Sequence, residues 1–272
     1  MKKLVLGDGY IGSAYKNDGY HCVSKEEFIY DGENFNELWE TLHEYDAIVN
    51  CIAETDTKWT EQPENFRATW QINVELVEKL SRFCKIFNKK FVQISTGDLY
   101  GNSFEWEKNT ETNFNLNSET NYRLTKLVAE RLCSPNDLIL RIRLPFDARN
   151  HPKNLVVKSR KYTKFYHWSN VYTYVPDLIK ATNLLLGKDL SGIFNIVQTQ
   201  ATGLLHLCKI HPVNSLVLTT DMHNKDDENV MRSLDVVHIH NDMNTSKILE
   251  HMEFEELHKA WEICSVLLDN VR

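Results

Sequence analysis

Short apolar runs alternate with longer amphipathic segments through the first half of the chain. The runs are rich in valine, isoleucine and leucine and end at glycine or polar residues, which is typical of buried strands. The segments between them repeat apolar positions at helical spacing. Strands that alternate with helices indicate an α/β fold with a doubly wound parallel sheet. The expected strands are 3–6, 21–24, 28–30, 47–52, 91–94 and 138–143, and the expected helices are 34–44, 63–88 and 120–132, with one more opened by residues 7–12.

The pattern becomes less regular after Pro145. Residues 146–175 are rich in lysine, arginine, asparagine and aromatic side chains, and they carry few helical signals. Proline at the start and glycine at the end are typical of a helix, and this pair brackets the next apolar stretch. The expected elements are a helix over 176–186, a strand over 192–197, a polar loop over 221–230 and a final amphipathic helix over 253–270.

The composition excludes several classes of protein. Of the 272 residues, 42% are apolar and 25% are charged, as in globular proteins. The net charge of −7 argues against a general nucleic-acid binder, and no apolar run reaches the length of a membrane span. Six cysteines without a C-x-x-C pair indicate reduced thiols and a cytoplasmic protein. The dispersed histidines form no cluster with cysteines or carboxylates, so we expect no metal site.

The stretch GDGYIG at residues 7–12 is the first candidate site. It follows a predicted strand and opens a helix, and it holds three of the chain's ten glycines. In a dinucleotide-binding loop Gly7 would make the tight turn, Gly9 would let the backbone approach the pyrophosphate, and Gly12 would let helix and strand pack closely. The helix N-terminus would supply free N–H groups to the phosphates. Tyr10 and Ile11 complete this expected cofactor loop.

Tyr122 and Lys126 form the second candidate site. They stand four residues apart on a predicted helix, so both side chains lie on one face. An ammonium beside a phenol favours the phenolate and brings the tyrosine pKa nearer neutrality. Such a pair suits a proton donor to a carbonyl oxygen that receives a hydride. Ser95 and Thr96 end the preceding strand, where open α/β sheets bind their ligands.

The end of the second predicted strand bears on the choice of cofactor. An acidic residue at this position binds the ribose 2′-hydroxyl of NAD. Ser24 and Lys25 suit a 2′-phosphate instead, so we expect NADP to be preferred to NAD. Glu26 and Glu27 follow at once and leave NAD open, and Asp31 is placed to reach the adenine side. The remaining expected cofactor contacts in this part of the chain are Cys51, Ile52, Ala53 and Asn73.

These motifs together resemble the extended short-chain dehydrogenase/reductases, and within them the nucleotide-sugar epimerases, dehydratases and reductases. GDGYIG is similar to the family's glycine loop, DAIVNCIA to its fourth-strand segment, STGDLYG to its serine/threonine motif and YRLTK to its Tyr-x-x-x-Lys pair. The likeness extends over nearly the whole chain. It is strongest to the 4-keto-6-deoxysugar reductases and 3,5-epimerase/4-reductases of rhamnose synthesis, through LRIRLPFDARNHPKNLVVK.

The resemblance implies an architecture and a set of roles. It implies a Rossmann-type dinucleotide-binding domain over 1–145 and a mainly substrate-binding lobe over 146–272, with about 165–190 returning to the first domain. Thr96, counted from the Tyr-Gly that ends its motif, would hydrogen-bond the substrate carbonyl. Tyr122 would protonate that carbonyl oxygen, and Lys126 would hold the nicotinamide ribose. The resemblance is also compatible with a homodimer, without deciding whether the protein forms one.

One position departs from the family pattern. Two residues after the catalytic threonine the epimerase-reductases carry a cysteine that moves a proton beside the keto group, and the 4,6-dehydratases carry a glutamate. Here the residue is Asp98, which is either an acid/base or a polar wall of the pocket. Lys158 matches the lysine that partners that cysteine. The negative nucleotide diphosphate needs cations, and the segment 153–164 is their expected source; the expected substrate contacts are Thr96, Asp98, Asn154, Lys158 and Arg160.

The sequence therefore predicts an NAD(P)H-dependent reductase of a nucleotide-diphosphate-linked 4-keto-6-deoxysugar, with epimerisation as an open addition. One alternative is a nucleotide-sugar 4-epimerase or 4,6-dehydratase that retains its NAD, which Asp98 leaves open. An alternative of another class is a catalytically silent, cofactor-binding regulatory subunit. The presence of both Tyr122 and Lys126 argues against the silent subunit.

Overall fold

The computed structural model describes residues 1–25, 27, 36–100, 110–112, 120–162, 164–165, 169–210, 218–219 and 243–270. The strand expected over 28–30, the loop expected over 221–230 and Asp31 lie outside these described residues.

A six-stranded sheet forms the centre of the molecule, in the order β2-β1-β3-β4-β5-β8. All five strand pairs are parallel, and the chain order reverses beside β1, as in doubly wound sheets. The predicted α/β class is therefore confirmed. The strands are β1 (Lys3–Leu6), β2 (His21–Val23), β3 (Ala47–Asn50), β4 (Lys90–Thr96), β5 (Leu138–Ile142) and β8 (Gly192–Asn195).

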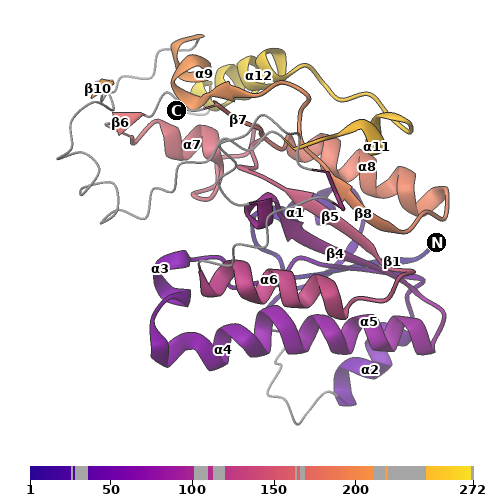
Figure 1. Ribbon diagram of the computed structural model, residues 1–272. Helices are drawn as coiled ribbons and strands as arrows, with labels where there is room; N and C mark the ends of the chain where they lie inside the picture. Colours follow the sequence, from indigo (N-terminus) through magenta and orange to yellow (C-terminus); the bar gives the residue numbers. More distant parts are fainter. Residues whose placement is uncertain are drawn as a thin grey trace.

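Helices cover both faces of this sheet (Figure 1). Along β1, Leu4 and Leu6 join the apolar cluster on one face and Val5 joins the cluster on the other. Because both faces are covered, the strands are continuous apolar runs rather than alternating ones. One face carries α2 (Asn36–His43), α4 (Phe66–Trp70), α5 (Leu76–Ile86) and α6 (Asn121–Leu132), and the other carries α1 (Tyr10–Asn17), α8 (Val175–Gly187) and α11 (Ser246–Leu249).

The helix expected over 63–88 is present but is not one regular helix. A 3₁₀ turn, η1 (Pro63–Asn65), leads into α4, and a π-helical segment, η2 (Gln71–Glu75), joins α4 to α5. The π-helical segment holds Asn73, which is buried. Apolar periodicity does not reveal a change from four-residue to five-residue hydrogen bonding, because the apolar face continues through it.

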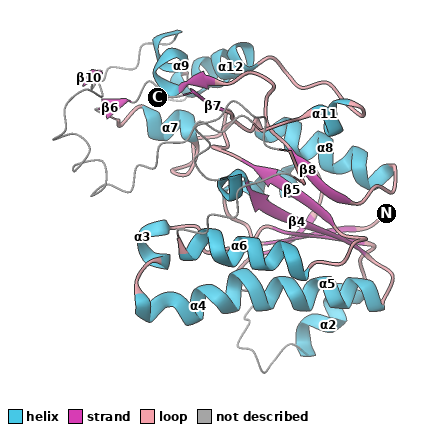
Figure 2. Cartoon of the chain, in the orientation of Figure 1, coloured by secondary structure: helices cyan, strands magenta, loops and turns pink. Residues whose placement is uncertain are grey.

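The C-terminal part adds a lobe beyond one end of the sheet (Figure 2). Its own core is built around Trp261, which is buried and whose ring lies 5.3 Å from Phe146 and 6.5 Å from Tyr172, centroid to centroid. The final helix expected over 253–270 is confirmed as α12 (Leu257–Asp269), whereas sequence patterns gave no sign of the two short helices of the lobe. The lobe contains α7 (Leu155–Ser159), α9 (Leu204–Ile210), α12 (Leu257–Asp269), and the strand pairs β6 (Lys164–Phe165) with β10 (Leu218–Thr219) and β7 (Ser169–Asn170) with β9 (Thr202–Gly203).

Between these lobe segments the chain returns to the sheet. The helix α8 packs against α1, and β8 pairs with β5 at the sheet edge. The segment expected to return, about 165–190, includes α8, which begins at Val175. The division into a first domain over 1–145 and a lobe over 146–272 remains a prediction. Within the described ranges, no helix combines the length and apolar character that crossing a membrane requires.

Candidate active site

The candidate active site lies where β4 ends. Thr96 is the last residue of β4, the 3₁₀ turn η3 (Gly97–Tyr100) follows it, and the first turn of α6 presents Tyr122. Thr120 caps α6 by accepting a hydrogen bond from the N–H of Arg123 at 3.2 Å, which fixes where the helix begins. The parallel sheet thus brings two motifs that are distant in sequence to one edge.

Tyr122 is buried, and the Thr96 hydroxyl lies close enough to the phenol to lower its pKa. The Thr96 hydroxyl also accepts from the backbone N–H of Asp98 at 3.1 Å. Burial raises the pKa of Tyr122, the Asp98 charge raises it further, and the Thr96 hydroxyl and the Arg143 charge oppose both effects. The phenol is therefore held protonated, as a proton donor must be.

Ser95 takes no part in this arrangement. Side chains alternate along β4, so Ser95 points to the opposite face from Thr96. Its hydroxyl lies 2.5 Å from Glu130 Oε1, and Glu130 is bound in turn by Arg141 through contacts of 2.6 and 3.0 Å. The geometry supports Thr96 rather than Ser95 as the hydroxyl that faces a substrate.

Lys126 is on the expected face of α6, but its ammonium does not reach Tyr122. The side chain is buried, and Nζ donates to the carbonyl oxygen of Ile94 at 2.9 Å. Burial lowers the pKa of Lys126 to about 8, and the nearby Glu130 charge partly offsets this. No hydrogen bond joins Lys126 to Tyr122 within the described residues. The charge effect expected between them from sequence is therefore not seen in this geometry.

Asp98 has a partner that the sequence analysis did not identify. The Arg143 guanidinium, at the end of β5, forms an ion pair with the Asp98 carboxylate. The Arg143 side chain is only 5% exposed, whereas that of Asp98 is 28% exposed. The sequence signal was an arginine directly after a buried strand, and its partner lies 45 residues earlier in the chain. Asp98 thus lies beside Tyr122 with a buried cation attached to it.

The glycine loop has the geometry of a dinucleotide cradle. Gly7 has φ +90°, a conformation that side chains disfavour. A Cβ on Gly12 would overlap the carbonyl oxygen of Gly7, whereas a Cβ on Gly9 would meet nothing within 4 Å. The first turn of α1 has no side-chain cap, so its N–H groups are open to a ligand. The structure thus keeps open the space and the donors that a pyrophosphate needs.

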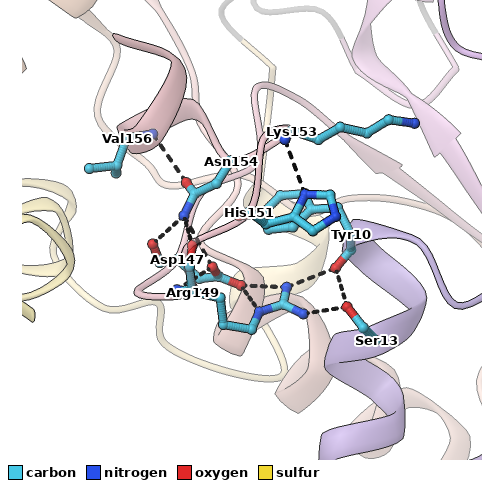
Figure 3. Close-up of polar contacts among 8 residues, drawn as sticks. All are labelled: Tyr10, Ser13, Asp147, Arg149, His151, Lys153, Asn154 and Val156. Carbon is cyan, nitrogen blue, oxygen red and sulfur yellow. Dashed lines mark hydrogen bonds and ion pairs between the residues drawn. The ribbon is translucent and has the colours of Figure 1, made fainter. Parts of the chain in front are cut away.

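A second chain segment holds the start of α1 in place (Figure 3). The Arg149 guanidinium donates to the carbonyl oxygen of Tyr10 at 2.8 Å and to Ser13 Oγ at 2.7 Å. It also lies 4.8 Å from the centre of the Tyr10 ring and pairs with Asp147 at 2.5 Å. The His151 ring stacks on Tyr10 at 5.0 Å. These contacts fasten the chain that leads into the lobe directly to the glycine loop.

The other expected cofactor residues lie along the ends of β2 and β3. Lys25 Nζ pairs with Glu54 at 2.7 Å, and Ser24 forms a turn with Glu27 through bonds of 2.8 and 3.1 Å. Asn73 binds the backbone of Glu54 in both directions, at 2.8 and 3.0 Å. The π-helical segment thereby holds the strand end that carries the Lys25 partner. Cys51, Ile52 and Ala53 lie between these contacts, half-buried, buried and half-buried respectively.

The expected substrate residues are divided between different surroundings. Asn154 is fully buried, caps α7 by accepting from the N–H of Val156 at 3.1 Å, and donates to the carbonyls of Asp147 and Arg149 at 2.7 Å. Arg160 pairs with Asp269 at 2.7 Å. Lys158 is exposed on α7. The structure therefore brings Thr96, Asp98 and Tyr122 together, whereas Asn154 and Arg160 make contacts within the lobe.

The described part of the chain contains no candidate metal site. Among the residues with assigned positions, no group of three histidine, cysteine, aspartate or glutamate side chains could hold a metal ion.

Several solved structures share this fold over nearly the whole chain. A UDP-rhamnose synthase of Acanthamoeba polyphaga mimivirus aligns with a TM-score of 0.76 at 18% identity, covering 97% of this chain and 98% of that one. A dTDP-4-dehydrorhamnose reductase of Bacillus anthracis in complex with NADP aligns at 0.74 and 16%, covering 97% and 98%. A UDP-glucuronic acid 4-epimerase of Bacillus cereus in complex with NAD aligns at 0.71 and 20%, covering 100% and 97%.

The sequence comparisons agree with this fold over part of the chain. A search of curated protein sequences finds no match. Residues 25–135, from just after β2 to just after α6, match the model of the NAD dependent epimerase/dehydratase family. That segment contains Thr96, Asp98, Tyr122 and Lys126. The resemblance to the NAD dependent epimerase/dehydratase family inferred from the motifs is thus confirmed over residues 25–135, and the chain shares its fold with the solved enzymes named above.

Proposed function

We propose that this protein is an NAD(P)H-dependent reductase of a nucleotide-diphosphate-linked 4-keto-6-deoxysugar. The observation that carries the proposal is the buried Tyr122 in the first turn of α6, beside Thr96 at the carboxyl end of β4. The family match and the relatives that act on UDP- and dTDP-sugars support the same substrate class.

The dinucleotide fits the glycine loop, where Gly9 leaves open space and the first turn of α1 offers uncapped N–H groups. Gly7, Gly9 and Gly12 would hold the pyrophosphate, and Ser24 with Lys25 would face the ribose of the adenosine half. When bound, the reduced nicotinamide supplies a hydride to the keto carbon. NADP and NAD are both found in structures of this fold, and Lys25 supports NADP.

The residues of this chain then complete the reduction. Thr96 orients the keto oxygen, and the Tyr122 hydroxyl donates its proton to that oxygen as the carbon–oxygen π bond breaks. The ketone becomes an alcohol, and Tyr122 is left as a phenolate that takes a proton from solvent. Burial of Tyr122 keeps water from competing for its proton and strengthens the electrostatic interactions at the site.

The nucleotide diphosphate requires positive charge outside this catalytic centre. In the segment 153–164, Lys158 is exposed on α7, whereas Arg160 is paired with Asp269. Lys158 is therefore the better candidate for a phosphate contact, and Asn154 would act by holding α7 in position.

A substrate panel tests the proposal. The purified protein is mixed with NADPH and, in turn, UDP- and dTDP-linked 4-keto-6-deoxysugars, and the loss of nicotinamide absorbance is followed. We expect NADPH oxidation that depends on the 4-keto sugar and is absent with the 4-hydroxy sugar. No oxidation with any 4-keto sugar would contradict the proposal.

If the protein instead carries tightly bound cofactor as purified and interconverts 4-hydroxy sugars, the retained-NAD epimerase or dehydratase is the correct function. A protein that binds cofactor and transforms no sugar would be the silent subunit.

A further inference from the structure

The cation that lies beside Asp98 and acts on Tyr122 is Arg143. Lys126, the cation expected from the Tyr-x-x-x-Lys motif, is occupied with the carbonyl of Ile94. The only cationic side chain that contributes to the Tyr122 environment in the described chain is Arg143. This relationship arises because β5 lies next to β4, so that the ends of the two strands meet at the same edge.

Arg143 is held rigidly at this position. Its N–H donates to Thr173 Oγ1 at 2.9 Å, and the N–H of Thr173 donates to the Arg143 carbonyl at 2.7 Å. A Cβ on Gly97 would lie 2.5 Å from Met243 Sδ, and Arg143 Cδ packs at ordinary contact distance, 3.4 Å, from the same position. The guanidinium is therefore packed in place rather than free to turn toward solvent.

The hydrogen bonds of this guanidinium are incomplete. Its Nη1 binds Asp98, but its buried Nε has no hydrogen-bond partner within the described residues. A buried unpaired donor costs free energy, so its retention at a site calls for an explanation. A charge kept close to a reacting group supplies one, because such preorganised charges stabilise developing charge strongly in a dry site.

We propose that Arg143 and Asp98 form an ion pair that controls the proton of Tyr122, with Arg143 stabilising the phenolate that remains after proton donation. In this proposal Arg143 is a positioning residue, because it acts through Asp98 and Tyr122 and is not placed in contact with substrate. Asp98 keeps the phenol protonated before the reaction, and Arg143 limits the cost of the negative charge afterwards. The proposal deepens the reductase function and rests on it for its role in turnover.

The other groups near Tyr122 do not replace this pair. From β4 the Thr96 hydroxyl lowers the pKa of the phenol, and from α6 itself Lys126 donates to the carbonyl oxygen of Ile94. Beyond α3 (Thr57–Thr60), Glu61 Oε1 accepts from the backbone N–H groups of Tyr122 at 3.4 Å and Asn121 at 2.8 Å, on the backbone side of the helix. Among the described residues, the charges that act on the pKa of Tyr122 are thus those of Asp98 and Arg143.

Because Asp98 and Arg143 carry opposite charges, removing each should shift the titration of Tyr122 in opposite directions. A purely structural role of the two residues would not predict opposite shifts. Asp98→Asn removes an anion and should move the titration of Tyr122 to lower pH. Arg143→Gln removes the cation and should move it to higher pH, and the double variant should return toward the wild type. The readout is the tyrosinate absorbance of each protein minus that of the same protein carrying Tyr122→Phe, which isolates one phenol and needs no substrate.

Two further variants keep the test decisive. Arg143→Lys retains the charge, so its Tyr122 should titrate closer to the wild-type pH than Tyr122 of Arg143→Gln does. This comparison remains useful even where the glutamine variant folds poorly. Lys126→Met should move the Tyr122 titration less than Arg143→Gln. The proposal would be overturned if Asp98→Asn and Arg143→Gln moved the Tyr122 titration in the same direction. It would also be overturned if Lys126→Met moved that titration more than Arg143→Gln does.

Turnover provides the second arm. We expect Arg143→Gln to lower kcat for the 4-keto sugar by at least ~10-fold with KM nearly unchanged, since a stabiliser of the phenolate acts on the transition state. A rise in KM at constant kcat would mean that Arg143 binds substrate instead, and would contradict the proposal. If the titration shifts are opposite but no 4-keto sugar is reduced, the ion-pair proposal stands and the reductase function fails.

Discussion

A Cβ on Gly12 would overlap the carbonyl oxygen of Gly7, so the first turn of α1 rests directly on the end of β1. At Gly9, three residues earlier, a Cβ would meet nothing within 4 Å. One glycine of the loop is therefore required by the protein itself, and the other is open toward the space where a dinucleotide would lie.

This contrast separates stability from binding. Gly12→Ala should lower the free energy of unfolding by ~3 kcal/mol or more, because backbone must move to admit the methyl group. Gly9→Ala should change it by less than about 1 kcal/mol, yet weaken NADPH binding at least ~10-fold through a clash with the pyrophosphate. Gly187→Ala, at the end of α8 and with nothing near its Cβ, is the matched control and should leave binding intact. Denaturant unfolding and NADPH fluorescence measure the two effects, and equal binding by Gly9→Ala and wild type would contradict the cradle.

Tyr122 should be essential for turnover but not for cofactor binding. Tyr122→Phe removes the proton donor and almost no volume, so we expect kcat to fall by at least ~100-fold. Tyr20→Phe is the matched control: its buried hydroxyl donates to Asn183 at 2.7 Å, away from the site. The control should keep full activity. If the Tyr122→Phe variant turns over like the wild type, Tyr122 has no part in the mechanism.

The choice between NADP and NAD should depend on Lys25. Because Lys25 forms an ion pair with Glu54, its positive charge is partly neutralised within the protein. Lys25→Ala should weaken NADPH more than NADH, whereas Glu54→Gln should release the lysine and strengthen NADPH relative to NADH. The ratio of kcat/KM for the two cofactors measures this. Lys2→Ala, which breaks the exposed pair with Glu44, is the control. A wild-type preference for NADH would assign the ribose contact to an acidic residue.

The sequence predicted the sheet and its main helices because these depend on local patterns. The runs around β1, β3, β4 and β5 are apolar enough to require burial on both faces, and the glycine loop marks the turn from β1 to α1. The change to π-helical bonding at Asn73 was not predictable, since it serves a contact with the backbone of Glu54, nineteen residues earlier.

The candidate site was only partly predictable for the same reason. Thr96 and Tyr122 are recognisable from their motifs, and the sheet brings them together. Arg143 was missed because it follows β5 whereas its partner Asp98 lies in the turn η3 after β4, and charge pairing between the ends of neighbouring strands leaves no local pattern. Arg160 was expected at the substrate because it belongs to a basic cluster, but its partner Asp269 lies 109 residues later. Periodicity and spacing do not report contacts of that kind.

Lys126 should make stability depend on pH. Burial lowers its pKa to about 8 in the folded state, from 10.5 in the unfolded chain. The unfolded state therefore binds this proton more tightly, which destabilises the fold below pH 8, and the penalty disappears as the pH rises toward 10.5. The shift corresponds to a change on the order of 3 kcal/mol. The stability of Lys126→Met relative to wild type should accordingly be greater at pH 7 than at pH 10.

Denaturant unfolding at the two pH values checks this, with Lys85→Met on the exposed side of α5 as the control. The control should show the same difference from wild type at both pH values. A constant difference for Lys126→Met as well would mean that the ammonium is not buried as the structure places it.

If the protein is a reductase as proposed, we expect Asp98 to decide whether epimerisation accompanies reduction. An epimerising base must exchange the proton beside the keto carbon with solvent, so the enzyme is incubated with a 4-keto-6-deoxysugar nucleotide in deuterated water and the product is analysed by mass. Deuterium gained at C3 or C5, and lost in Asp98→Asn, would establish an acid/base role for the carboxylate. We expect rapid reduction without enzyme-dependent incorporation, because Asp98 is engaged by Arg143 and the cysteine of the bifunctional relatives is absent. Incorporation that survives Asp98→Asn would point to a different base at the same site.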